Sequence, residues 1–263
     1  MQTQIFATTA LLPSGWAHDV AIGIDAAGRI ASVTPGARAG AAHRTVPLIP
    51  APANLHSHAF QRAMAGLTEA RGPDPRDTFW TWRQQMFRFL DRLTPDDVQA
   101  ITAFVQMEMQ EAGFAAVGEF HYLHHAPGGR PYADPAEMSA RICAAAAQTG
   151  IGLTLLPVLY QVGGRDRRAL APGQIRFGHD PDSYARLVQD CAPLIGALPA
   201  DTKLGTAPHS LRAVTDAGLQ AAVALAGDRP IHMHLAEQLA EVDELVAHTG
   251  ARPVTYLLDR AEV

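Results

Sequence analysis

Apolar segments alternate with helix-start signals from residue 46 to the end of the chain. The apolar segments predict about five strands, at residues 46–50, 114–122, 151–159, 203–208 and 230–235. Helices are expected between them, at residues 77–93, 94–111, 134–150, from 180 onward and 237–248. Three of these starts, Thr94-Pro95, Asp134-Pro135 and Asp180-Pro181, place a capping side chain before a proline. Strands that alternate with helices form a parallel sheet with helical crossovers, so the sequence predicts an α/β fold.

The first 45 residues differ from the rest, because they contain strand patterns without helices. Val20–Ile24 and Arg29–Val33 alternate in polarity around the turn Ala26-Ala27-Gly28, which predicts a β-hairpin. We therefore expect a small β domain at residues 1–45 and a main α/β domain at residues 46–263.

Polar side chains gather where the expected strands end. They include His56, His58, residues 119–122, His209, His234 and Glu237. The carboxyl ends of parallel strands carry the functional site in a (β/α)8 barrel and in an open α/β sheet. The glycine motifs of nucleotide-binding sheets do not occur, which favours the barrel. About five of the eight βα units that a barrel needs can be found, so we expect a distorted, partial barrel whose remaining units belong to a longer protein, or else a different fold.

Histidine spacing predicts a metal site. His56 and His58 lie two residues apart in an extended segment and therefore point the same way, as two ligands of one divalent ion would. His232 and His234 repeat the spacing far downstream; we expect His234 to be the third ligand and His232 to be a packed core residue. Glu237 follows where the strand gives way to a helix, within reach of a water molecule beside the metal. A metal lowers the pKa of its bound water to about 7, and a nearby carboxylate can move the proton to a leaving group.

Composition narrows the possible partners and compartments. The net charge is -5 and the pI is near 6.2, which argues against nucleic acid and anionic membranes as partners. Cys143 and Cys191 lie far apart and form no Cys-x-x-Cys motif. No apolar run is long enough to span a membrane, and the first residues do not resemble a signal peptide. We therefore expect a cytoplasmic protein that acts on a small molecule.

Five segments together resemble one protein family. They are Asn-Leu-His-Ser-His-Ala-Phe-Gln-Arg-Ala-Met-Ala-Gly (54–66), Phe-Trp-Thr-Trp-Arg (79–83), Glu-Phe-His-Tyr (119–122), Ala-Pro-His-Ser-Leu-Arg-Ala-Val (207–214) and His-Met-His-Leu-Ala-Glu-Gln (232–238). The chain resembles the amidohydrolase superfamily, and more narrowly the N-formimino-L-glutamate deiminases of bacterial histidine degradation. The resemblance extends over the whole chain. It implies a mononuclear zinc enzyme, with one Zn²⁺ per subunit and a homodimeric assembly, that hydrolyses N-formimino-L-glutamate to N-formyl-L-glutamate and ammonia.

The resemblance also assigns roles to residues. His56, His58 and His234 match the metal ligands of the family, and Glu237 matches its acid/base residue. The positions that match substrate-binding residues are Gln61, Arg83, Tyr122, His209 and Arg212. Arginine is suited to a dicarboxylate substrate, because its guanidinium binds carboxylates through paired, charge-assisted hydrogen bonds. The family also uses a histidine after the sixth strand and an aspartate after the eighth, and neither has a counterpart in this sequence.

Several alternatives remain open from the sequence. The same metal motif would serve another amidohydrolase-type deaminase, acting on a nucleobase or a guanidino compound. The chain could also be an inactive fragment of such an enzyme. Arg83 and Arg212 could instead be surface or structural arginines. Trp80 and Trp82 are expected in the core or the pocket wall, and Arg165, Arg167 and Arg168 in a solvated loop.

Overall fold

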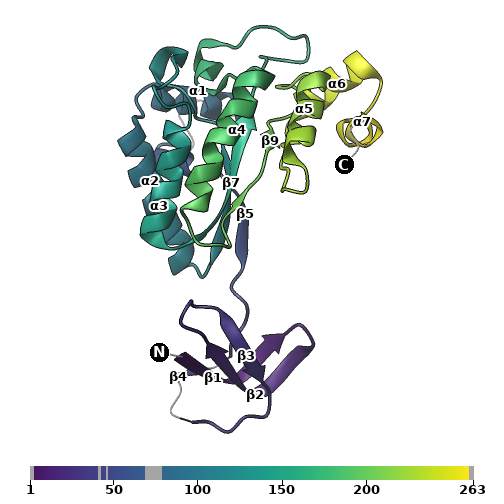
Figure 1. The fold of residues 1–263 in the computed structure, drawn as a ribbon. Coiled ribbons are helices and arrows are strands. Elements are labelled where there is room, and N and C mark those ends of the chain that lie inside the picture. Colours follow the sequence, from purple (N-terminus) through teal and green to yellow (C-terminus); the bar gives the residue numbers. More distant parts are fainter. Residues whose placement is uncertain (1–2, 41–42, 46, 69–78, 261–263) are drawn as a thin grey trace. The chain divides into compact units, whose positions relative to one another are not determined.

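The computed structural model describes residues 3–40, 43–45, 47–68 and 79–260. The chain divides into two compact units, Met1–Pro52 and Ala53–Val263. Each unit has its own sheet, shown in Figure 1, and the two are described separately below.

The first unit is a four-stranded sheet in the order β3-β2-β1-β4. Its strands are β1 (Thr3–Leu12), β2 (Gly15–Ile24), β3 (Ile30–Thr34) and β4 (His43–Thr45). The predicted hairpin between β2 and β3 is confirmed. The Asp25 carboxylate stabilises its turn by accepting hydrogen bonds from the backbone N–H groups of Ala27 and Arg29, both at 2.9 Å.

The strand predicted at residues 46–50 is wrong. Val46 lies outside the described residues, Pro47, Ile49 and Pro50 are exposed, and Leu48 makes only an isolated bridge to Ala10. The two prolines lack the N–H groups that a buried strand must donate. The strand that carries the first histidine pair is instead β5 (Ala53–Ser57).

The second unit contains a parallel sheet, as the alternating pattern predicts. Its strands are β5, β6 (Ala116–His121), β7 (Gly152–Leu159), β8 (Lys203–Leu204) and β9 (Ala207–Pro208). The order is β5-β6-β7-β8, and β9 also pairs with β7. All of these pairings are parallel. The α/β prediction is therefore confirmed, in the form of a partial barrel-like sheet.

Helices form the crossovers between these strands. The long helices are α1 (Phe79–Leu90), α2 (Pro95–Glu111), α3 (Glu137–Thr149), α4 (Pro181–Gly196), α5 (Asp216–Ala226), α6 (Leu239–Thr249) and α7 (Pro253–Arg260). Three 3-10 segments, η1 (Ala59–Met64), η2 (Pro127–Gly129) and η3 (Pro172–Phe177), lie in loops at the carboxyl end of the sheet. Helices α2, α3 and α4 pack side by side against one face of the sheet (Figure 1). The second unit has an apolar core that includes Phe120, Leu153, Leu155, Leu156 and Leu187.

Two of the three predicted helix caps are confirmed. Thr94 and Asp97 form a reciprocal capping box at the start of α2, and Asp180 accepts the Ser183 N–H at the start of α4. The third is wrong: α3 begins at Glu137 without a side-chain cap, because the Asp134 carboxylate instead accepts the Ala136 N–H within the preceding turn. Helices α5 and α7 were not expected, and none of the helices in the described part of the chain is long and apolar enough to cross a membrane.

The last two predicted strands are interrupted. Residues 203–208 form two short strands, and residues 230–235 contribute only isolated parallel bridges at Ile231 and His234. The two segments approach so closely here that a Cβ on Gly205 would collide with the Pro230 carbonyl oxygen. Helix α6, predicted at residues 237–248, starts two residues later than predicted, at Leu239. Even so, the bridge between Ser210 and His234 brings His234 to the carboxyl end of the sheet.

Candidate active site

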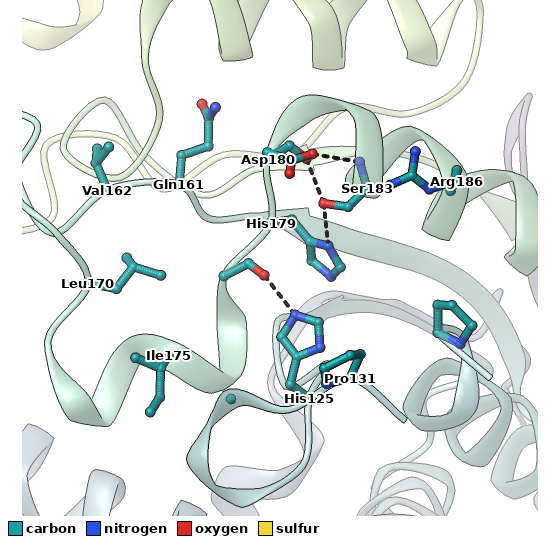
Figure 2. A pocket seen from close by; sticks show the side chains of 13 residues that line it. His125, Pro131, Gln161, Val162, Leu170, Ile175, His179, Asp180, Ser183 and Arg186 are labelled. Atoms are coloured by element: carbon teal, nitrogen blue, oxygen red, sulfur yellow. Dashed lines mark hydrogen bonds between the residues drawn. The ribbon is translucent and has the colours of Figure 1, made fainter. Parts of the chain in front are cut away.

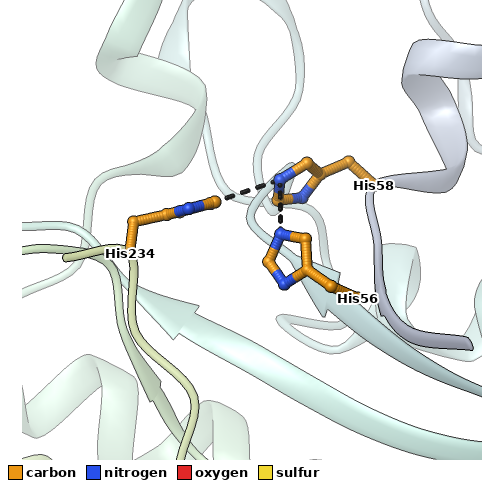
Figure 3. Close-up of side chains that lie close together, drawn as sticks. All are labelled: His56, His58 and His234. Carbon is orange, nitrogen blue, oxygen red and sulfur yellow. Dashed lines mark hydrogen bonds between the residues drawn. The ribbon is translucent and has the colours of Figure 1, made fainter. Parts of the chain in front are cut away.

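Three histidines from distant parts of the chain converge at the carboxyl end of the sheet. The Nε2 atom of His58 lies 3.1 Å from Nε2 of His56 and 3.3 Å from Nε2 of His234 (Figure 3). Within the described residues, these three form the group of potential ligands whose donor atoms lie within 4.8 Å of one another. The structure thus brings together the three residues that the sequence predicts as metal ligands.

The distances between these nitrogen atoms suit a zinc ion. Zinc binds histidine nitrogen at about 2.0–2.1 Å in tetrahedral sites, which places neighbouring ligand nitrogens about 3.3 Å apart. Two of the three separations, 3.1 Å from His58 to His56 and 3.3 Å from His58 to His234, agree with that geometry, and all three lie within 4.8 Å. Three imidazoles are also the protein ligand set of one class of catalytic zinc site, which keeps its fourth position open.

The protonation of His58 prepares it to bind a metal. Its Nδ1 atom lies 2.9 Å from the Phe120 carbonyl oxygen, which can only accept, so Nδ1 carries the proton and Nε2 presents a lone pair. Burial lowers the pKa of His58 to about 3 and that of His234 to about 4, while the nearby Glu237 charge partly opposes the shift at His234. The rings of His58 and His234 are therefore neutral at pH 7, as metal ligation requires.

The buried carboxyl of Glu119 holds the loop that carries His56 and His58. Glu119 lies near the end of β6 and is only 2% exposed. Its Oε1 accepts the N–H of Ala59 at 2.7 Å, and Ser57 also bonds to its side chain. Burial raises the pKa of this carboxyl to about 7. Glu119 therefore bonds to both neighbours of His58, to the backbone of Ala59 and to the side chain of Ser57.

Glu237 reaches the site through an unusual backbone turn. Ala236 has a φ of 58°, in the left-handed region that residues with a side chain rarely adopt. Such strain costs about 1 kcal/mol or more and is concentrated at functional sites. The turn separates His234 from helix α6 and leaves the Glu237 side chain lining the same cavity as His58 and His234.

Arg212 joins Glu237 to a second carboxylate. Its Nη2 donates to Oε2 of Glu237 at 2.6 Å, and its Nη1 donates to Oε2 of Glu241 at 2.7 Å. Glu241 is buried, whereas the Glu237 side chain is 29% exposed. Sequence reasoning missed Glu241. The sequence feature that could have revealed it is the pair Glu237 and Glu241, two like charges four residues apart at a predicted helix start. Such a pair is unfavourable without a cation between them.

One small cavity of about 50 Å³ collects the other residues singled out from the sequence. Its lining comprises His58, Gln61, Trp82, Arg83, Met86, Tyr122, Tyr160, Phe177, His209, Arg212, His234 and Glu237. All five positions expected to bind substrate are among them. Met86, Tyr160 and Phe177 were not foreseen, although Tyr160 directly follows β7 and so lies where polar side chains were expected.

Hydrogen bonds and ring contacts hold the walls of this cavity in place. Gln61 donates to the Tyr122 hydroxyl at 2.8 Å, and burial raises the pKa of Tyr122, so the hydroxyl stays protonated. Arg83 Nη2 lies 3.4 Å from the Tyr160 hydroxyl. The His209 ring packs 4.5 Å from the ring of Tyr160, and burial keeps the pKa of His209 well below its usual range. The cavity therefore presents two arginines and several neutral hydrogen-bonding groups.

Two expectations about other residues need correction. His232 is half-buried and not fully packed in the core; its ring lies near Gly118 of β6, and it does not belong to the group of three ligands in the described part of the chain. Arg165 is not solvated, because its side chain is only 9% exposed and donates to Asp216 and Tyr256. Arg167 and Arg168 are exposed, as expected.

A larger cavity of about 720 Å³ lies beside the start of helix α4 (Figure 2). His179 lines it and bonds to Ser183, while His125 bonds to the Gly178 carbonyl. The ring nitrogens of these two histidines do not belong to a group with the close spacing of the triad in the described part of the chain. We therefore place the candidate chemistry at the small cavity beside His58.

Two family models match the sequence. Residues 48–262 match the model of the amidohydrolase family, and residues 2–45 match the model of the N-terminal domain of formimidoylglutamate deiminase HutF. The first match covers most of the chain.

Individual relatives agree with these matches. The chain is 48% identical to a formimidoylglutamate deiminase from Pseudomonas aeruginosa, over 98% of this chain and 57% of that protein. It is 26% identical to an 8-oxoguanine deaminase from the same organism, over 80% of this chain and 44% of that protein. The chain thus spans less than two thirds of the length of either relative.

Solved structures show the same fold. An amidohydrolase from Brucella melitensis superimposes with a TM-score of 0.95 at 48% identity, over 99% of this chain and 58% of that one. An adenosine deaminase from Xanthomonas campestris with bound zinc gives a TM-score of 0.69 at 20% identity, over 98% of this chain and 54% of that one. The second likeness supports the fold alone.

Proposed function

We propose that this chain, which belongs to the amidohydrolase family, provides the metal site and substrate pocket of a zinc-dependent deiminase. The reaction is hydrolysis of N-formimino-L-glutamate to N-formyl-L-glutamate and ammonia. The observation that carries the proposal is the convergence of three histidine nitrogens beside a cavity lined by two arginines.

Zinc is the metal that fits the ligand set best. Three imidazoles whose ligand atoms lie within 4.8 Å, two pairs of them 3.1 and 3.3 Å apart, suit a tetrahedral ion, and a solved structure of the same fold holds zinc. When bound, the ion would lower the pKa of a coordinated water molecule to about 7 and so supply a nucleophile at neutral pH. His56, His58 and His234 would hold it.

Glu237 is the residue that moves protons. Water must add its oxygen to the formimino carbon, the bond from that carbon to the terminal nitrogen must break, and the departing nitrogen must gain a proton to leave as ammonia. Glu237 lines the cavity next to His234 and can accept the proton from water and return it to the leaving nitrogen. No other carboxylate side chain is among the described residues lining this cavity.

Arg83 and Arg212 fit the two carboxylates of the substrate. Each guanidinium lines the cavity, and charge-assisted bonds to carboxylates are stronger than neutral ones. Tyr122, Gln61 and His209 can donate or accept hydrogen bonds between them. The cavity is small, at about 50 Å³. Arg212 already bonds to Glu237, so it must exchange that bond for one to the substrate carboxylate when the substrate enters.

A second candidate is deamination of a purine-type base. The similarity to 8-oxoguanine deaminase supports it, and so do the aromatic side chains of Trp82, Tyr122 and Phe177 in the cavity wall, since a planar base would stack on them. The two arginines favour the dicarboxylate, because a neutral base leaves a guanidinium without a charged partner.

The cytoplasmic location and the homodimer stay predictions from the sequence.

One ammonia-release assay separates the two candidates. Zinc-loaded protein is incubated with N-formimino-L-glutamate, guanine or 8-oxoguanine, each over a range of concentrations. We expect ammonia from N-formimino-L-glutamate, with kcat/KM at least about a hundredfold above that for either base, since a site built for charged groups discriminates strongly. Preferential deamination of a base would refute the proposal.

A further inference from the structure

We propose that Glu241 is a positioning residue that holds Arg212 ready for a substrate carboxylate. This inference rests on the proposed function of the cavity. Glu241 itself is not among the residues lining that cavity in the described part of the chain, so it acts through Arg212 and Glu237.

The contacts of Glu241 connect two functional residues. Its Oε2 accepts Nη1 of Arg212 at 2.7 Å and the backbone N–H of Glu237 at 3.0 Å. A single carboxylate oxygen thereby fixes the guanidinium of the substrate clamp and the backbone of the acid/base residue.

Burial strengthens the ion pair between Glu241 and Arg212. Glu241 is 4% exposed as a residue and its side chain is 2% exposed, while the Arg212 side chain is 15% exposed. Removing one partner from a buried ion pair leaves an uncompensated charge, which is strongly unfavourable. The pair is therefore expected to persist when the cavity fills.

The other oxygen of Glu241 is buried, and its side chain lines the same small cavity as that of Arg165. Glu241 Oε1 and Arg165 Nε are both buried without a hydrogen-bond partner among the described residues, and both side chains line the same small cavity behind Arg212. Arg165 is fixed in turn by Asp216 and Tyr256. Glu241 is thus held by Arg212 and by the Glu237 N–H, while Arg165 lines the same small cavity.

This arrangement leaves Arg212 able to exchange one partner without losing its orientation. A guanidinium has five N–H donors, and the bond from Nη1 to Glu241 leaves Nη2 free to change partners. With Glu241 in place, a substrate carboxylate can replace Glu237 at Nη2, and Glu237 is released for proton transfer. Without the Glu241 charge, Glu237 is the remaining carboxylate bonded to Arg212, and the substrate must compete with a tighter ion pair.

The test compares Glu241→Gln with Asp243→Asn in the zinc-loaded protein. Glutamine keeps the size of the side chain and an oxygen for the Glu237 N–H, but removes the charge. Asp243 lies in the same helix, is exposed, and serves as the matched control for loss of one negative charge. We expect Glu241→Gln to raise KM for N-formimino-L-glutamate about tenfold or more, the usual effect of weakening a bond to a charged group, while kcat changes by less than about threefold. Asp243→Asn should leave both parameters unchanged.

Two substrate analogues distinguish positioning from a general structural effect. N-Formimino-4-aminobutyrate lacks the α-carboxylate, and N-formimino-2-aminobutyrate lacks the γ-carboxylate. The effect of Glu241→Gln on kcat/KM should nearly vanish with the one analogue that lacks the carboxylate bound by Arg212. Glu241→Asp, which retains the charge at a shorter reach, should fall between wild type and Glu241→Gln.

Equal losses with all three substrates would assign Glu241 a structural role and overturn the inference. A lower KM in Glu241→Gln would also overturn it, because Glu241 would then act only by repelling the anionic substrate. Binding of N-formyl-L-glutamate, measured by calorimetry, separates this inference from the proposed function. If wild type binds this ligand without hydrolysing N-formimino-L-glutamate, the proposed function fails, while weaker binding by Glu241→Gln still supports the inference. If wild type does neither, both fail.

Discussion

The buried carboxyl of Glu119 should make the stability of the metal-free protein depend on pH. Burial raises its pKa from 4.5, the value of an exposed glutamate, to about 7. The folded state therefore binds a proton more tightly than the unfolded state. Stability from this group is fully present below pH 4.5 and is lost as the pH rises toward 7. The difference between the two pKa values corresponds to a loss of about 3 kcal/mol.

Glu119→Gln tests this reasoning directly. Glutamine has an oxygen that can accept the Ala59 N–H, but it does not ionise. We expect the free energy of unfolding of wild type to fall by about 3 kcal/mol relative to the variant between pH 4.5 and pH 8. The measurement is urea denaturation of metal-free protein, followed by circular dichroism at several pH values. Glu111→Gln, at an exposed position at the end of α2, is the matched control.

Parallel pH profiles for wild type and Glu119→Gln would refute the argument. That result would mean that Glu119 is ionised in the folded state at the same pH as in the unfolded chain, and that burial does not govern its charge. A profile for Glu111→Gln that departs from wild type would show that a general charge effect is responsible.

Four further predictions follow from the contacts described above. Glu237→Gln should lower kcat for ammonia release about a hundredfold or more with unchanged zinc content, and activity within a few-fold of wild type would remove Glu237 from proton transfer. Arg212→Ala should raise KM for N-formimino-L-glutamate steeply with little loss of zinc, and unchanged steady-state kinetics would exclude it from the substrate site. Burial lowers the pKa of His121 to about 3 and of His179 to about 4, so their contribution to stability is present above pH 6.5 and is lost as the pH falls, which urea denaturation of variants with glutamine at both positions should detect as a smaller fall in the free energy of unfolding than in wild type between about pH 6 and 4. Thr94→Ala should destabilise the protein by about 1 kcal/mol in urea denaturation by removing the capping box of α2, and an unchanged midpoint would contradict that role.

The sequence predicts the parallel sheet and the candidate site well, because both depend on local patterns. Thr94 and Asp180 cap helices through side-chain bonds to residues three positions away, and such bonds form whatever the rest of the chain does. The spacing of His56 and His58 needs only an extended backbone to send both rings to one side. Their meeting with His234 follows from the parallel sheet, whose strands end at a common edge.

The errors arise where tertiary contacts override local signals. Residues 46–50 are apolar enough for a strand, but the two prolines lack N–H donors, and residues 47–50 pair only through the bridge at Leu48. The segment around His234 was predicted as a strand, but in the structure it pairs only through isolated bridges at Ile231 and His234. Arg165 lies in a run of arginines that is typical of a solvated loop. Its burial depends on Asp216 and Tyr256, which are far away in the sequence.

Glu241 was missed for the same reason. A glutamate early in a helix is usually an exposed residue that interacts with the helix dipole. Only the fold shows that Arg212, from a different loop, lies between it and Glu237.

The central claim is that His56, His58 and His234 together hold one metal ion. Calorimetric titration of the metal-free protein with zinc tests it most directly, alongside His58→Ala, His234→Ala and, as a control, His232→Ala. The account predicts about one zinc ion per chain for wild type and His232→Ala, and a loss of affinity of at least about a hundredfold for the other two variants. Zinc binding by His58→Ala and His234→Ala with the stoichiometry and affinity of wild type would contradict it.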